Sequence, residues 1–277
     1  MNSAKAFSPA NISCIFKIYE HKNPRWAGSY GLGFTLSEGV VVSVSKSKKN
    51  VILFNGKKIN FPTVKRAAQI LSPQNFKISI KTNLPLGCGF GLSGASALAA
   101  AYAINKLLKL KKSGKDLAII AHTSEVENKT GLGDVVNQYY GGFCLKLTPS
   151  SFFVVKKIPL SGIPVYCRHF SKLSTKSVIS NPDIKGMINK SATDSINKVG
   201  ELMKHKKMDF GEVIRISKEF AESSGLLKDK RTIRAILDIE KRGGNASMIM
   251  LGNSVFSNIK FPGARKYSIS DKGAHFL

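Results

Sequence analysis

The first part of the chain alternates short apolar runs with polar residues. Alternation with a period of two is typical of strands that bury one face, and Gly, Pro and Asn separate the runs as they do at turns. We expect five strands here, at residues 14–19, 33–36, 39–45, 50–56 and 76–82. Residues 62–71 differ, because their apolar positions recur along one side of a helix that has Pro62 near its start.

The pattern changes after residue 94. Residues 95–110 are rich in alanine and leucine and apolar on most faces, which predicts a buried helix. Further helices are expected at 116–128, 135–142, 183–206, 208–224 and 229–241, and strands at 143–148, 152–158 and 163–170. A glycine turn and one closing strand are expected at 243–257, and a linker or lid at 171–182. This mixture predicts an α+β fold in two lobes, residues 1–155 and 156–277.

The composition is that of a globular protein, since 43% of the 277 residues are hydrophobic. No apolar run approaches the roughly 18 residues of a membrane span, and the first residues lack the apolar segment of a secretory signal. Cysteines 14, 88, 144 and 167 form no CxxC pair and no zinc-type spacing. We therefore expect a cytoplasmic protein with free thiols and no membrane partner.

The net charge of +26 would attract any polyanion, so nucleic acid is the main rival partner. Only eight of the 43 basic residues are arginine, whose fork reads base edges, and the lysines are scattered. Scattered lysines are more typical of a solvated surface. We expect no specific nucleic-acid partner, with a basic nucleic-acid-binding protein as the alternative from another class.

The densest chemical signal is the segment PLGCGFGLSGASA, residues 85–97. It joins an expected strand to the alanine-rich helix, and glycines at 87, 89 and 91 allow backbone N–H groups to close around phosphate oxygens. The positive end of the helix dipole points to the same place. A tight turn without a ligand is the alternative, although it needs fewer glycines. The dinucleotide spacing GxGxxG is also met, but without the expected second strand, and GxxxxGK[ST] is absent.

Three of the 17 acidic residues flank a second glycine-rich segment. Glu125 and Glu127 lie near the end of an expected helix, and Asp134 begins the next one after Gly131 and Gly133. Phosphoryl transfer needs a carboxylate for Mg²⁺ and a group that orients or accepts the acceptor's proton. The residues thus suit a kinase, although Asp134 also suits a simple helix N-cap.

These motifs resemble those of the GHMP kinase superfamily. The loop is similar to the family's PxxxGLGSSAA segment, with Ser93 at its second serine, and residues 7–12 match the Pro-containing first motif. The resemblance implies a ribosomal-protein-like N-terminal lobe and a ferredoxin-like C-terminal lobe. It also implies that ATP phosphates bind the loop, whose residues are Pro85, Gly87, Cys88, Gly89, Phe90, Gly91, Leu92, Ser93 and Gly94.

The resemblance also implies site roles. Ser93 and Glu125 would hold Mg²⁺, with Glu127 as the alternative ligand, and Asp134 would contact the attacking hydroxyl. Four segments in order, AGSYGLGFTL, GFGLSGASAL, EVENKTGLGDV and ASMIMLGNSVF, resemble the archaeal pantoate kinases within that superfamily. This implies phosphorylation of (R)-pantoate to 4-phosphopantoate in coenzyme A biosynthesis. Mevalonate or homoserine is the alternative acceptor, and a homodimer is left open.

Acceptor-binding candidates follow from the same resemblance and from chemistry. A carboxylate beside a gem-dimethyl group needs a cation and an apolar wall. Arg25, or a lysine in its place, is the candidate cation. Trp26, Met248 and Met250 are candidates for the wall, although core packing is the alternative for each methionine. His122 is a candidate for the carboxylate or a packed core histidine. The remaining candidates are Asn11, Ser29 and Ser247.

Overall fold

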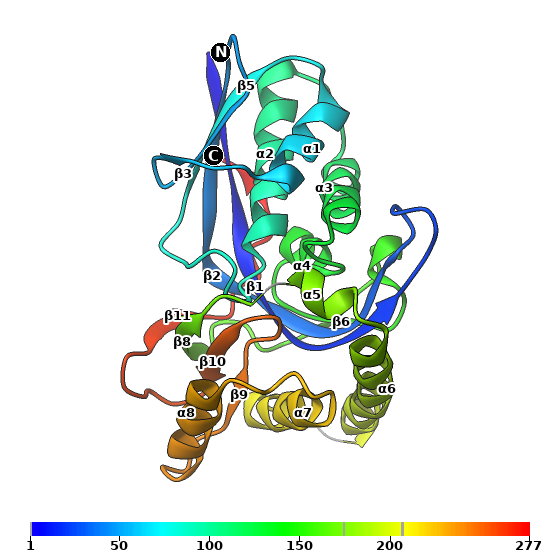
Figure 1. Ribbon diagram of the computed structural model, residues 1–277, viewed down its shortest axis with the longest axis vertical. Coiled ribbons are helices and arrows are strands. Elements are labelled where there is room, and N and C mark those ends of the chain that lie inside the picture. The colour runs from blue at the N-terminus through cyan, green and yellow to red at the C-terminus, as the bar shows by residue number, and fades with distance from the viewer. Residues whose placement is uncertain (1, 174, 206–207) are drawn as a thin grey trace.

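A computed structural model describes residues 2–173, 175–205 and 208–277. It shows two lobes, one above the other in Figure 1, each built from a sheet and covering helices. The predicted α+β class and two-lobed arrangement are confirmed. No helix in the described ranges is both long enough and apolar enough to cross a membrane.

Two long antiparallel strands, β1 and β2, form the centre of the upper sheet, whose order is β12-β1-β2-β5-β3-β4. Strand β5 pairs with residues 41–46 of β2, whereas β6 pairs with residues 31–34 of β2, and β7 pairs with β6. The strands of this sheet are β1 (Ser3–Tyr19), β2 (Gly28–Lys46), β3 (Val51–Phe54), β4 (Lys57–Lys58), β5 (Phe76–Lys81), β6 (Phe143–Lys146), β7 (Lys156–Ile158) and β12 (His275–Phe276). The short 3₁₀ helix η1 (Ser150–Phe152) lies between β6 and β7.

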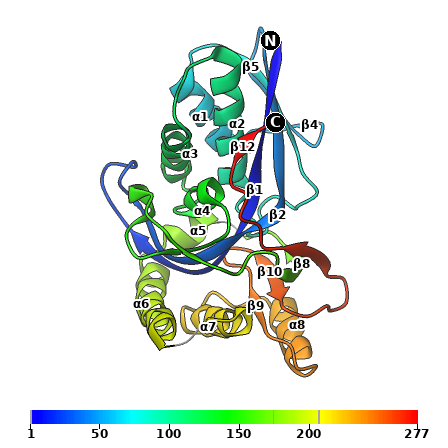
Figure 2. The same ribbon diagram turned by 180° about the vertical axis from the view of Figure 1, so that it is seen from behind.

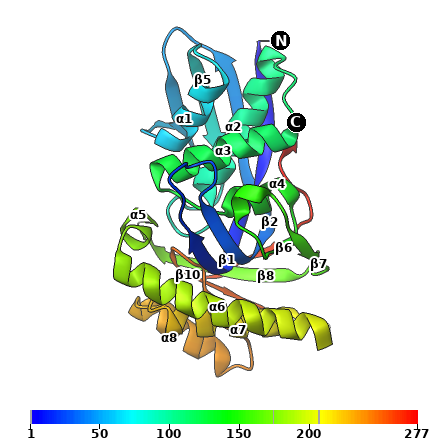
Figure 3. The same cartoon turned by 90° about the vertical axis from the view of Figure 1, so that its right-hand side faces the viewer.

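Helices cover one face of this sheet, as Figure 3 shows from the side. They are α1 (Pro62–Leu71), α2 (Leu92–Leu108), α3 (Gly114–Asn128) and α4 (Asp134–Tyr140). Helix α2 packs against β1 and β2 on one side and against α1 and α3 on the other. Nearly all of α2 is buried, because its small alanine side chains let the strands and neighbouring helices approach closely. The helix therefore fixes the glycine-rich loop that precedes it.

The lower lobe has a four-stranded antiparallel sheet in the order β11-β8-β10-β9. Its strands are β8 (Pro164–Ser171), β9 (Ala246–Met248), β10 (Asn253–Ser257) and β11 (Arg265–Ser268). Its helices are α5 (Thr175–Ile179), α6 (Pro182–His205), α7 (Phe210–Ser223) and α8 (Lys230–Glu240). Helices α7 and α8 pack against β9, and α8 also packs against β10.

The β1–β2 hairpin belongs to both lobes. The C-terminal half of β1 contacts α6 and α7 of the lower lobe. The side chain of Asn189 in α6 bonds both backbone groups of Ile18, accepting from its N–H at 2.7 Å and donating to its carbonyl at 3.2 Å. Ser217 in α7 donates to the Cys14 carbonyl at 3.0 Å. These bonds satisfy buried polar groups where the lobes meet.

Aromatic side chains from both lobes meet at Phe34 of β2. The ring of Phe34 stacks on Phe143 at 5.1 Å, and it meets Phe210 and Phe256 edge-on at 5.7 Å. Phe143 belongs to the upper sheet, whereas Phe210 begins α7 and Phe256 lies in β10. Offset and edge-to-face ring contacts add to the burial of apolar area. The core is thus continuous between the lobes.

Most expected elements are confirmed, and several are longer than expected. The strands expected at 33–36 and 39–45 form one strand, β2, and the strand expected at 14–19 begins at Ser3. The single strand expected at 243–257 is wrong, because Leu251, with φ of 61°, and Gly252 turn the chain between β9 and β10. Helix α6 confirms the helix expected at 183–206 as far as His205, and residue 206 lies outside the described ranges.

The two-lobe boundary stays a prediction, and two elements cross it. Strand β7, just after residue 155, pairs with β6 of the upper sheet. The C-terminal strand β12 returns to the upper sheet beside β1, as Figure 2 shows from behind. The linker expected at 171–182 contains the short helix α5.

Candidate active site

The glycine-rich loop lies between β5 and α2 and has the backbone conformation that its composition predicts. Gly87, Gly89 and Gly91 have φ of 81°, 87° and 60°, the region that glycine adopts without steric cost. Gly91 is the N-cap of α2, and its carbonyl accepts a bond of 2.8 Å from Gln138 Nε2 in α4. The glycine conformations and the hydrogen bond from Gln138 of α4 therefore fix the shape of the loop.

The turn between β9 and β10 backs this loop. Ser254 Oγ donates to the Cys88 carbonyl at 2.9 Å, and the backbone of Gly252 lies against Cys88. A β carbon on Gly89 would lie 2.7 Å from Ile249 Cγ2 and 2.9 Å from the Met250 carbonyl. The β9–β10 turn thus supports the glycine-rich loop from behind.

A cavity of about 410 Å³ opens in front of the loop. Its walls come from the loop, the segment from Glu125 to Asp134, the β1–β2 hairpin and the α5 region. The α5 residues Thr175, Lys176 and Ile179 line the cavity, so the segment expected to be a linker or lid forms one of its walls. Its volume is within the range of small-molecule sites.

Asp134 is placed at this cavity by two residues of β1. Its Oδ1 accepts bonds from Asn11 Nδ2 at 2.7 Å and from Ser13 Oγ at 3.1 Å. The register of β1 shifts just before Asn11 and just after Ser13, and bulges of this kind re-aim side chains next to active sites. A β carbon on Gly91 would lie 3.2 Å from Asp134 Oδ2. The carboxylate therefore lies between the first motif and the phosphate-loop candidate.

A buried lysine, Lys146 of β6, completes the surroundings of Asp134. Lys146 is 3% exposed, and its Nζ donates to Asn137 Oδ1 at 3.2 Å. Asn137 in turn donates to Asn11 Oδ1 at 2.9 Å, which fixes the orientation of the Asn11 amide. Burial lowers the pKa of Lys146, and the charge of Asp134 raises it again. Burial raises the pKa of Asp134 above its usual value, while Lys146 opposes that rise.

Sequence reasoning missed Lys146, Ser13 and Asn137. Lys146 occurs in the strand FCLKLT, where a lysine among apolar residues has no feature that separates it from the other lysines of a basic chain. Ser13 is two residues after Asn11, so both side chains share one face of β1, and this spacing was the available signal.

Glu125, near the end of α3, also lines the cavity and is 1% exposed. Thr130 donates to Glu125 Oε1 at 3.2 Å. Thr130 also bonds Thr63 at 3.0 Å, and Ser93 donates to Thr63 at 3.2 Å, so one chain of hydroxyls joins the loop to the acid. Burial and the charge of Asp134 raise the pKa of Glu125 to about 8.

The Glu125 oxygen Oε2 is buried without a hydrogen-bond partner among the described residues. An orphaned carboxylate oxygen facing a glycine loop suits a bound cation, because Mg²⁺ takes oxygen ligands from one or two carboxylates and from phosphates. Ser93, whose hydroxyl donates to Thr63, lines the same cavity as Glu125. The donor set of Glu125 and Ser93 therefore fits Mg²⁺.

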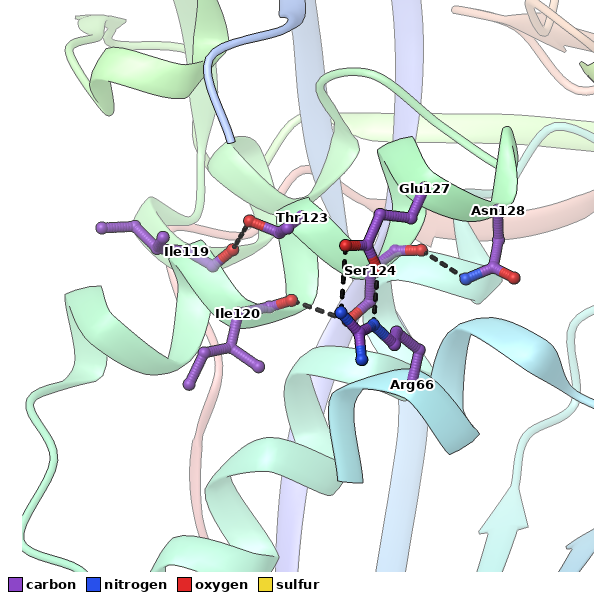
Figure 4. A network of polar contacts seen from close by, with 7 residues as sticks. All are labelled: Arg66, Ile119, Ile120, Thr123, Ser124, Glu127 and Asn128. Atoms are coloured by element: carbon purple, nitrogen blue, oxygen red, sulfur yellow. Dashed lines mark hydrogen bonds and ion pairs between the residues drawn. The ribbon is translucent and has the colours of Figure 1, made fainter. Parts of the chain in front are cut away.

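Glu127 points away from the cavity. In Figure 4 its carboxylate faces Arg66 of α1, and two bonds of 2.6 Å and 3.2 Å join them. The same figure shows Ser124 and Thr123 bonding the carbonyls one turn earlier in α3. Glu127 thus has a partner on the surface, and the geometry favours Glu125 as the metal ligand.

Comparison with known proteins agrees with this geometry. Residues 62–142 match the model of the GHMP kinases N terminal domain. The chain is 34% identical to the pantoate kinase of Methanocaldococcus jannaschii over 90% of each chain, and 32% identical to that of Methanospirillum hungatei over 91% of this chain and 86% of the relative. The chain belongs to the GHMP kinase family.

Solved structures show the same fold. One described as a phosphotransferase related to the CoA biosynthesis pathway superposes with a TM-score of 0.85 at 24% identity, covering 99% of this chain and 98% of the other. Mevalonate diphosphate decarboxylase of Enterococcus faecalis superposes with a TM-score of 0.75 at 16% identity, with 99% and 98% covered. The GHMP kinase fold therefore extends over both lobes.

The structure brings only some of the predicted acceptor residues to the cavity of this kinase. Ser29 and Met250 line the cavity. Asn11 does not line it, but its side chain donates to Asp134, which does. Arg25 lies in the exposed loop after β1 and stacks on Trp26, with its guanidinium carbon 5.4 Å from the ring centroid. Neither Arg25 nor Trp26 lines the cavity.

Three further candidates are buried elsewhere. His122 Nε2 donates a bond of 2.9 Å to the Ala27 carbonyl, and burial lowers the pKa of His122 to about 4, as expected for a packed neutral histidine. Ser247 bonds Ser217 at 3.0 Å within the lower lobe, and Met248 is 1% exposed. None of the three lines the cavity.

Within the loop, Cys88 is 2% exposed, and burial raises the pKa of its thiol. The Cys88 side chain and Pro85 do not line the cavity, whereas Gly87, Gly89, Phe90, Gly91, Leu92 and Ser93 do. Gly94 follows in α2, where a β carbon would lie 2.7 Å from Glu125 Oε2. Cys88 thus supports the loop with its carbonyl, and its thiol is shielded from reagents.

The raised pKa of Glu125 predicts that Glu125→Gln stabilises the ligand-free protein at high pH. The folded state keeps a proton on Glu125 from the usual 4.5 up to about 8, whereas the unfolded state loses it near 4.5. Stability is therefore lost as pH rises through this window, and the amide avoids that loss by on the order of 1–3 kcal/mol. We expect the melting temperature of Glu125→Gln to exceed that of wild type at pH 8.5 and to match it at pH 5. Equal melting temperatures at both pH values would contradict the burial of a charged Glu125.

The packing behind the loop predicts the effect of Gly89→Ala. The added methyl group would collide with Ile249 and push the loop forward, and misplacement by about 1 Å can cost 10²-fold in turnover. We expect the KM for ATP to rise tenfold or more. Gly56→Ala is the matched control, because Gly56 has φ of 83° but no atom within 4 Å of a new β carbon. If both variants raise the KM equally, backbone strain alone explains the effect.

Proposed function

We propose that the protein transfers the γ-phosphoryl group of ATP to the hydroxyl of (R)-pantoate and forms 4-phosphopantoate and ADP. The relatives that match along nearly the whole chain are named pantoate kinases, and the match supports the same acceptor here. The observation that carries the proposal is the position of Asp134, held by Asn11 and Ser13 beside Gly91 of the loop.

The backbone amides of the loop and the N-terminus of α2 bind the phosphates of ATP. Glu125 and Ser93 would hold Mg²⁺, which would supply positive charge to the β and γ phosphates when bound. Asp134 accepts the hydroxyl proton of the acceptor as the new oxygen–phosphorus bond forms and the bond to the β phosphate breaks. Lys146 stabilises the charged form of Asp134 before the reaction, because the two charges attract each other in a buried setting.

The acceptor lies between β1, β2 and the segment before α4. Ser29 lines this part of the cavity, and Phe16 and Leu132 give it an apolar wall. Lys129 and Lys176 also line the cavity and supply positive charge for the acceptor carboxylate or the ATP phosphates. These lysines replace Arg25 in our assignment, because the Arg25 side chain is directed to Trp26. The proposal includes a cytoplasmic location and needs no nucleic acid.

An ADP-release assay with pantoate, mevalonate and homoserine tests the proposal. We expect turnover with pantoate, and at least a tenfold lower kcat/KM with the other two. A higher kcat/KM with mevalonate or homoserine than with pantoate would support the kinase activity but contradict pantoate as the acceptor. Release of ADP without stimulation by any of the three would contradict the assignment of the acceptor site.

The role of Asp134 predicts that Asp134→Asn lowers kcat by about 10² or more, the usual contribution of a general base. The amide oxygen still accepts from Asn11 and Ser13, so we expect an unchanged melting temperature. Asp183→Asn, at an exposed position in the first turn of α6, is the control for loss of one negative charge. Near-normal turnover of Asp134→Asn would exclude Asp134 as the base and leave it a structural role at the start of α4.

A further inference from the structure

Four of the eight arginines surround a second cavity, of about 220 Å³, in the lower lobe. Arg168 comes from β8, Arg231 and Arg234 from α8, and Arg242 follows α8. None of them lines the candidate active site. Figure 1 places α8 at the lower edge of the molecule, below the second sheet. Such a concentration of arginine is unexpected in a chain whose positive charge is mostly lysine.

Two of these guanidinium groups are held in place by Phe170. The guanidinium carbons of Arg168 and Arg231 lie 5.0 Å and 5.7 Å from the centroid of its ring. Arg168 also donates to the Pro262 carbonyl at 3.0 Å, and Arg231 donates to Ser171 Oγ at 2.9 Å. Stacking and these bonds fix both forks before any ligand arrives, which lowers the entropy lost on binding.

The positive charge of this cavity is only partly compensated. Asp229 Oδ2 lies 3.0 Å from Arg231, and Asp238 Oδ2 lies 3.9 Å from Arg234. In the described ranges no carboxylate forms an ion pair with Arg168 or Arg242. Arg168 and Arg242 therefore keep guanidinium donors without a carboxylate partner. Arg231 bonds both Ser171 and Asp229 through Nη2, so among the described residues its Nη1 and Nε remain for an anion.

Below the arginines the floor of the cavity is apolar. Phe261 and Ile239 are 5% and 1% exposed, and Ala235 packs beside them. A floor of this kind suits the organic part of a ligand, and the guanidinium rim suits a phosphate, which arginine binds with two parallel bonds.

We propose that this cavity, the arginine site, binds a small organic phosphate outside the active site, with the phosphate on Arg231 and Arg242 and the organic part on Phe261. A hollow of about 220 Å³ fits a compact phosphate ester. Nucleic acid would instead need an extended basic groove with aromatic rings free for stacking, whereas two guanidinium groups already occupy Phe170. The inference does not depend on the proposed acceptor.

Phenyl phosphate is the probe, titrated by calorimetry at physiological salt. We expect binding to wild type and at least tenfold weaker binding to the double variant Arg231→Gln/Arg242→Gln. The matched control is Lys230→Gln/Lys241→Gln, which removes the same charge from adjacent positions that do not line the cavity. We expect the control to bind as wild type does. The Gly89→Ala variant, whose phosphate loop is displaced, should also bind phenyl phosphate normally.

Several results would overturn the arginine site. Phenyl phosphate that fails to bind wild type, or that binds equally well to the double arginine variant, excludes it. Equal weakening in the lysine control shows a general charge effect. Loss of binding in Gly89→Ala alone assigns the probe to the active site. Arginine-dependent binding of a uridine oligonucleotide in the absence of phenyl phosphate binding indicates a nucleic-acid surface. Unchanged kinase turnover in both double variants verifies that they fold.

Discussion

The candidate site depends on the placement of two acidic side chains beside a loop that must accept a polyanion. Burial raises the pKa of both carboxyl groups, and the charge of Asp134 raises the pKa of Glu125 further. Lys146 is the buried cation that opposes this effect at Asp134. A cation at Glu125 would displace its proton and stabilise the carboxylate, which fits a reaction that brings Mg²⁺ with its nucleotide.

The fold makes this placement possible by passing one hairpin through both lobes. Strand β1 carries Asn11 and Ser13 to Asp134 in the upper lobe, and further along it bonds α6 and α7 of the lower lobe. The phosphate loop is likewise formed in the upper lobe and supported by the β9–β10 turn of the lower one. A change in the packing of either lobe would therefore move the backbone of β1 or of the glycine-rich loop, and with it the site.

The lysines and arginines that give the chain its high positive charge are distributed differently. Most lysines are spread over the surface, where solvent screens them, whereas Lys146 is buried. Surface ion pairs such as that of Lys198 and Glu219 contribute little to stability. Arginines instead gather at the arginine site, and Arg66 pairs with Glu127 beside α3. The total charge thus says less about partners than the positions of the few arginines do.

The sequence alone determined the class of fold, and it marked the glycine-rich loop, Glu125 and Asp134 as candidates, which the structure brings to one cavity. These follow from local rules, because alternation, helical periodicity and glycine-rich turns depend on residues close in the chain. The tertiary structure decided the rest. Lys146 approaches Asp134 from strand β6, and nothing in its local pattern marks it. The spacing of Ser13 from Asn11 is a local signal, but only the packed chain brings both side chains to Asp134. The choice of Glu125 over Glu127 depended on the distant Arg66, and the exclusion of Arg25 and Ser247 from the cavity depended on contacts across elements. Burial and long-range contact are properties of the packed chain, so only the packed chain could supply them.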